Sequence, residues 1–190
     1  ARAIVGSACG NDAQGVVNHL KNYGYDVLND TESPSTVDND NWSESTLLTL
    51  MQGDYQIFHH GNHANESGWC TPPCATLPSI DTNDIWSSAI AARIAANHPI
   101  FTSNGCRAGL AAARADTNPL SITTSEPTMV NALVREGASA VMASTGISFF
   151  DADYGDIRGG EDFIKDFWGL AASPPPKQLN MGMALRWNKR

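Results

Sequence analysis

The sequence predicts an α/β fold, with a mostly parallel, doubly wound sheet and helices on both faces. Short apolar runs alternate with segments of helical periodicity along the whole chain. The strand-like runs are apolar throughout rather than alternating, which is typical of strands that are buried on both faces. The 190 residues are enough for one sizeable core, so we interpret residues 1–190 as a single domain.

The amino-acid composition and net charge make some kinds of binding partner less favourable than others. Hydrophobic residues make up 42% and charged residues 17% of the chain, as expected for a compact folded domain. The net charge of −8 disfavours nucleic acid, because a phosphate-binding surface is normally basic. No apolar run reaches the length of a membrane span, so no membrane partner is predicted. A peptide or protein substrate fits this balance better, and the oligomeric state is left open.

The order of elements follows from periodicity and from helix start and stop signals. We expect strands at residues 2–7, 25–28, 55–58, from 100 to Cys106, and 138–143. We expect helices from residue 11 or 12 to 24, then 43–53, 81–97, 107–115, 127–137, from 161 onward, and 177–190. The intervening polar stretches, 29–41, 62–80, 116–126 and 144–160, are predicted to be loops.

Two of the predicted strands end in residues that carry chemistry. The strand at 55–58 leads into His59, His60 and Gly61, and the strand that begins at Ile100 ends at Cys106. Carboxyl ends of parallel strands meet at one edge of the sheet, where ligands bind. We therefore expect His60 and Cys106 to lie side by side.

A cysteine beside a histidine is the arrangement needed for nucleophilic attack on a carbonyl carbon. The thiolate is the attacking species, and an imidazole can take its proton and pass it to the leaving amine. We expect the N–H groups of Gly61 and Cys106 to form an oxyanion hole. A helix starting at Arg107 would present its positive end to the thiolate.

His60 is preferred over its two neighbours as the catalytic base. Gly61 follows it directly, and strand alternation places His59 on the opposite face. His63 is interpreted as a surface loop residue. Asp12 and Glu66 are both candidates for orienting the imidazole, and neither is compelled by the sequence.

These motifs together resemble the caspase-like, clan CD cysteine peptidases, and most of all the gingipain family. The resemblance rests on the His60-Gly61 and Cys106 strand ends, on residues 137–146, and on residues 179–186, and it covers roughly residues 1–188. It implies a caspase/gingipain-like three-layer sandwich. It also implies a cysteine endopeptidase that works through a Cys106–His60 dyad and requires no cofactor.

The resemblance further implies a specificity pocket built partly by the loop after the fifth strand. That loop supplies Ser144, Phe149, Phe150, Asp151 and Asp153. An acidic pocket would select Arg or Lys in the substrate. Three uses of the aspartates stay open: selecting a basic residue, binding calcium through Asp151, Asp153 and Asp156, or forming a solvated acidic turn.

Other functions remain open at this point. The chain could be a non-catalytic caspase-like binding or scaffold domain, or a small-ligand domain, although no phosphate-binding glycine loop follows the first strand. A zinc site is the rival chemistry, with the candidate ligands His59, His60, His63, Cys70 and Cys74. Cys70 and Cys74 could instead form a local disulfide. The sequence does not fix the compartment, and a secreted location is favoured.

Overall fold

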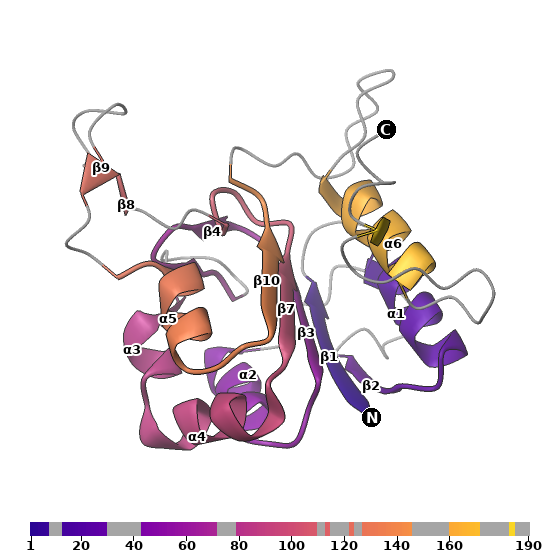
Figure 1. The fold of residues 1–190 in the computed structure, drawn as a ribbon, viewed down its shortest axis with the longest axis horizontal. Coiled ribbons are helices and arrows are strands. Elements are labelled where there is room, and N and C mark those ends of the chain that lie inside the picture. Colours follow the sequence, from indigo (N-terminus) through magenta and orange to yellow (C-terminus); the bar gives the residue numbers. More distant parts are fainter. Residues whose placement is uncertain are drawn as a thin grey trace.

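The structure is a computed structural model whose centre is a five-stranded sheet. It describes residues 1–7, 13–29, 43–71, 79–109, 113–114, 122–123, 127–145, 160–171 and 183–184. The strand order is β10-β7-β3-β1-β2 (Figure 1). The strands are β1 (Arg2–Ser7), β2 (Asp26–Asn29), β3 (Ile57–Gly61), β7 (Ile100–Ser103) and β10 (Ala140–Ala143). Every neighbouring pair is parallel, which confirms the predicted fold class.

Helices cover both faces of this sheet (Figure 1). One face carries α1 (Ala13–Asn22) and α6 (Gly160–Ala171), and the other carries α2 (Glu44–Met51), α3 (Thr82–Ile85), α4 (Ser88–Asn97) and α5 (Met129–Arg135). Two buried apolar clusters result, one under each helical layer. Successive strand residues contribute to opposite clusters, as Ile57 and Phe58 do. None of the helices in the described residues is long and apolar enough to cross a membrane.

Local sequence signals set the helix ends. Ser43 caps α2 by accepting a hydrogen bond from the N–H of Thr46, as its position before the apolar stripe predicts. Gly24 and Gly137 adopt positive φ angles of 94° and 103° after α1 and α5, where a side chain would be strained.

Three expectations about elements are wrong. The helix predicted at 81–97 is two helices, α3 and α4, because Asp81 forms a capping box with Asp84 and the chain turns again at Trp86. No helix begins at Arg107, since residues 106–109 form a turn. The strand predicted to be buried at 138–143 is half-buried as β10, because it lies at the sheet edge and has one neighbour.

The region between β3 and α3 is more ordered than the predicted loop. It forms a three-stranded antiparallel sheet of β4 (Ala64–Asn65), β5 (Gly68–Trp69) and β6 (Ile80–Asp81). A two-residue turn, Glu66-Ser67, joins β4 to β5, and we call residues 64–69 the hairpin. A second small pair consists of β8 (Ala113–Arg114) and β9 (Ile122–Thr123). Of the predicted C-terminal helix, residues 183–184 are described and are helical.

Candidate active site

The carboxyl ends of the central strands lie level with one another. His60 of β3 is in register with Ser103 of β7, and Ser103 with Ala143 of β10. β3 also adjoins β1, where the strand order reverses, so this edge is where a doubly wound sheet offers a ligand crevice. Every candidate residue described below lies at this edge or just beyond it.

Cys106 lies in a tight turn just after β7. Its side chain is half-buried, and it is not in a disulfide. The next residue, Arg107, has a φ of 54°, a left-handed conformation that is costly for a residue with a side chain. Since the chain turns here and forms no helix, the predicted helix dipole does not act on this thiol.

Two glycines allow this turn, residues 105–109, to pack tightly against the neighbouring segments. A Cβ on Gly105 would lie 2.6 Å from the carbonyl oxygen of Asn62 and would also clash with the Cβ of Ala64. A Cβ on Gly109 would lie 2.8 Å from the carbonyl carbon of Ala143. The N–H of Gly109 donates to the carbonyl of Ser144 at 2.8 Å. The turn that carries Cys106 is therefore wedged between the hairpin and the end of β10.

His60 is fully buried in the apolar layer under the hairpin. Its ring stacks on Trp69, with centroids 5.3 Å apart and an interplanar angle of 17°. Nε2 lies 3.0 Å from the carbonyl oxygen of Cys70, and Nδ1 lies 3.1 Å from Oγ of Ser103. Burial lowers the pKa of His60 to about 4, because the cation would lose its hydration; the bond to Cys70 opposes this shift and nearby His63 adds to it. His60 is thus a neutral imidazole with both nitrogens engaged.

His59 points to the other face of the sheet, as strand alternation predicts. It is buried, and its Nδ1 is hydrogen-bonded to Oγ1 of Thr102 at 2.9 Å. Burial, with a smaller contribution from nearby His60, lowers the pKa of His59 to about 3. This histidine therefore lies on the face of the sheet opposite to His60.

His63 is the exposed histidine of the three. The carbonyl of Asn62 and the backbone N of Ala64, on either side of it, both lie against Gly105, the residue before Cys106. Its backbone N–H donates to Oδ1 of Asn62 at 2.7 Å, and its carbonyl accepts from the N–H of Cys70 at 2.9 Å. The backbone around this predicted surface loop residue therefore lies next to the turn that carries Cys106.

The backbone amide of Ala64 faces the same turn. Ala64 is in register with Trp69, and the N–H of Cys70 bonds the carbonyl of His63, so this is a pair whose own amides point away from each other. The amide nitrogen of Ala64 is 3.2 Å from where a Cβ of Gly105 would be. By contrast, Gly61 is buried as the last residue of β3, in register with Ser7.

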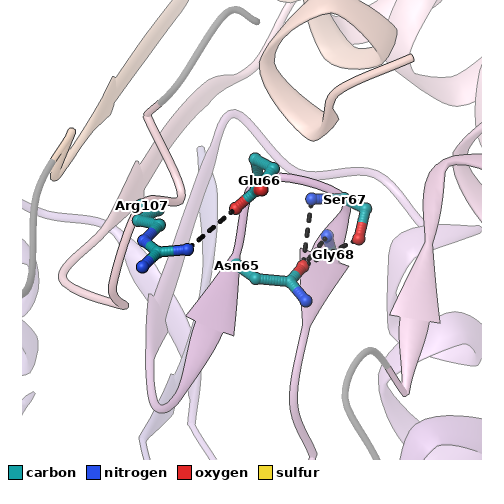
Figure 2. A network of polar contacts seen from close by, with 5 residues as sticks. All are labelled: Asn65, Glu66, Ser67, Gly68 and Arg107. Carbon is teal, nitrogen blue, oxygen red and sulfur yellow. Dashed lines mark hydrogen bonds and ion pairs between the residues drawn. The ribbon is translucent and has the colours of Figure 1, made fainter. Parts of the chain in front are cut away.

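The turn of the hairpin carries a polar network (Figure 2). Oδ1 of Asn65 accepts from the N–H groups of Ser67 and Gly68 and from the hydroxyl of Ser67, at 2.9–3.0 Å. Figure 2 shows Glu66 reaching across to Arg107, with 4.0 Å between carboxylate oxygen and guanidinium nitrogen. Glu66, one candidate for orienting the imidazole, thus pairs with the residue after Cys106. The other candidate, Asp12, lies outside the described residues.

The predicted specificity pocket is described only at its start. The carbonyl of Ser144 accepts from the N–H of Gly109, so Ser144 adjoins the turn at residues 105–109. The remaining members, Phe149, Phe150, Asp151, Asp153 and the calcium candidate Asp156, lie outside the described residues.

The zinc candidates that the structure describes do not converge on a common site. Among the described residues, no group of three or more His, Cys, Asp or Glu side chains is arranged to hold a metal ion. His59 and His60 lie on opposite faces, and Cys70 is in a disulfide, which removes its thiolate as a ligand. Cys74 lies outside the described residues.

The five-stranded parallel sheet with helices on both faces matches the fold of the caspase-like class of cysteine peptidases. Within that class the chain belongs to peptidase family C25, the gingipain family, whose model matches residues 11–190. The fold is similar to that in the complex of Porphyromonas gingivalis RgpB pro- and mature domains, with a TM-score of 0.63 and 14% identity. The alignment covers 97% of this chain and 40% of that one, so this chain spans less than half of its length. A search of curated proteins finds no match.

Proposed function

We propose that this domain is a cysteine endopeptidase in which Cys106 is the nucleophile and His63 the general acid and base. The observation that carries the proposal is the turn holding the half-buried thiol of Cys106, which packs against the backbone on both sides of exposed His63. Membership of peptidase family C25 supports the reaction class. Peptides or proteins are the proposed substrates.

His63 replaces the predicted His60 in this proposal because of burial. A base that serves Cys106 has to accept the thiol proton and meet a substrate that arrives from solvent. His60 has no exposed surface, and its lone-pair nitrogen already accepts from Ser103. Protonating it in the apolar layer is unfavourable, as its lowered pKa indicates. His63 is exposed, so a substrate arriving from solvent can reach its imidazole.

The reaction then follows ordinary acyl-transfer chemistry. His63 takes the proton of the Cys106 thiol, and the thiolate attacks the scissile carbonyl carbon to form a tetrahedral oxyanion. The imidazolium returns the proton to the amine as the C–N bond breaks. Water, deprotonated by His63, hydrolyses the thioester and releases the carboxylic acid. The proposed oxyanion donors are the N–H groups of Cys106 and Ala64, with Ala64 taking the role predicted for Gly61.

Specificity and compartment belong to the same proposal. Cleavage after Arg or Lys rests on the aspartates of residues 151–156, and a peptide panel tests it directly. A secreted location is supported by the disulfide at Cys70, because such bonds persist in oxidising compartments.

An alkylating peptidyl ketone tests the dyad. Peptidyl ketones ending in Arg, Lys, Leu or Asp are incubated with the 190-residue chain, and the modified residue is mapped by mass spectrometry. We expect modification at Cys106 and none in Cys106→Ala. His63→Ala lowers the rate by 100-fold or more with an unchanged melting temperature, about the contribution of a positioned base. Full labelling in His63→Ala would reject the dyad, and no labelling of the wild type would favour a binding or scaffold domain.

A further inference from the structure

We infer that a buried polar network centred on the carbonyl of Cys70 sets the spacing of Cys106 and His63, with His60 as a positioning residue in one branch. The inference rests on the proposed dyad and adds what holds it in place. Cys70, His60, Asn62 and Ser103 are all buried, so the bonds among them are shielded from competing water.

The first branch runs from Cys70 to the nucleophile turn. A carbonyl oxygen can only accept, so Nε2 of His60 is the donor to Cys70 at 3.0 Å. In the neutral ring Nδ1 then has a lone pair and accepts from the hydroxyl of Ser103 at 3.1 Å. The Ser103 oxygen in turn accepts from the N–H of Gly105 at 3.2 Å. The accepting carbonyl of Cys70 thus sets the direction of each bond in this branch. The branch ends on the backbone amide of Gly105, the residue before Cys106.

The second branch runs from the same carbonyl to His63. The side-chain amide of Asn62 donates from Nδ2 to Cys70 at 3.4 Å and accepts at Oδ1 from the N–H of His63 at 2.7 Å. Asn62 has no exposed surface, so these bonds dictate its orientation. One carbonyl oxygen thus connects, through three side chains, to the backbone of His63 and to the amide of Gly105, the residue before Cys106.

The network has a function beyond stability because of what it joins. A dyad must be held to within fractions of an ångström of its working geometry. Cys106 follows β7 and His63 follows β3, on turns that could shift independently. The network ties both turns to the carbonyl of Cys70, the residue that follows β5. Because Gly105 has no side chain, the two turns can pack closely against each other. Removing an internal bond therefore changes reactivity more than it changes folding.

The matched control is the neighbouring pair on the other face. Thr102 and His59 form the same kind of buried hydroxyl–imidazole bond from the same two strands, at 2.9 Å, but it leads to neither turn. Ser103→Ala breaks the network, Ser103→Thr retains the hydroxyl, and Thr102→Val removes the control bond at constant shape. The four proteins are compared by melting temperature, by the limiting rate and apparent affinity of Cys106 alkylation by a peptidyl ketone, and by hydrogen exchange of the Gly105 amide.

We expect Ser103→Ala to lower the limiting rate by about 10- to 100-fold with apparent affinity unchanged, since a small displacement of reacting groups has that effect. Ser103→Thr should stay within about threefold of the wild type, and Thr102→Val should lower the melting temperature without slowing alkylation. Equal rates for Ser103→Ala and wild type, or equal slowing in Thr102→Val, would overturn the inference. If the wild type itself does not react, the proposed function fails, and the network is judged by whether Ser103→Ala alone exposes the Gly105 amide to exchange.

Discussion

The rings of His60 and Trp69 stack in the interior, and the ring of Phe58 also stacks on the same indole. The two ring pairs have centroids 5.3 Å and 5.1 Å apart. Trp69 therefore holds the hairpin onto the sheet while it closes the pocket around His60. This contact explains how a histidine directly before a glycine, at the end of a strand, becomes a core residue.

Truncating that indole should destabilise the domain strongly. Trp69 is 2% exposed, so Trp69→Ala should cost about 3–5 kcal/mol in the free energy of unfolding. Trp69→Phe keeps one ring on His60 and should cost clearly less. Urea unfolding of the three proteins measures both values, and equal stability of the alanine variant and the wild type would contradict the stack.

Acid should destabilise the domain through two neutral histidines. The pKa values of His59 and His60 are lowered from 6.5 to about 3 and about 4, so below pH 6.5 the unfolded chain binds protons that the folded chain does not. Their contribution to stability is complete above pH 6.5 and is lost as the pH falls toward 4. The slope should approach about 2.7 kcal/mol per pH unit for the pair.

Urea unfolding between pH 7.5 and 4.5 measures that slope. His59→Asn removes one of the two groups, so its slope should be about half that of the wild type over the same range. A slope unchanged by this substitution would assign the acid sensitivity to other groups.

A methyl group at position 105 should displace the nucleophile turn. Gly105→Ala places a Cβ into both Ala64 and the carbonyl of Asn62. We expect a loss of about 1–3 kcal/mol in stability together with slower alkylation of Cys106. Adding Ala64→Gly removes one of the two clashes and should recover part of both losses. Thermal melts and alkylation kinetics test this prediction. If Gly105→Ala has the melting temperature and the alkylation rate of the wild type, the turn is not tightly packed at this position.

The left-handed conformation of Arg107 should be visible in the choice of replacement. Arg107→Ala and Arg107→Gly both remove the ion pair to Glu66, but glycine adopts a φ of 54° without strain. The glycine variant should therefore be more stable than the alanine variant by about 1 kcal/mol. Since Arg107 is 43% exposed, the ion pair itself should contribute little, and Arg107→Lys should be nearly neutral. An alanine variant more stable than the glycine variant would contradict the left-handed conformation of residue 107.

The fold class, and the two strands at whose ends we propose the site, could be predicted from the amino-acid sequence alone. Runs that are apolar on both faces specify buried parallel strands, and their alternation with helical periodicity gives the layers, so the sheet and most helix ends agree with expectation. It also indicated that His59 and His60 face opposite ways, because the period of a strand is two. Cys106 was singled out because it pairs, at the matching strand end, with the histidine–glycine corner of His60 and Gly61.

Which histidine lies beside the turn that carries Cys106 could be learned only from the folded structure. The glycine after His60 suggested a corner there, but β3 continues through Gly61, and Trp69 from the hairpin buries His60. That burial depends on contacts between segments that are distant along the chain. Hydrophobic periodicity does not predict such contacts. The hydrogen bonds of Ser103 and Asn62 could not be predicted for the same reason. The sequence does not distinguish a polar residue at a strand end that faces water from one that bonds a histidine in the core.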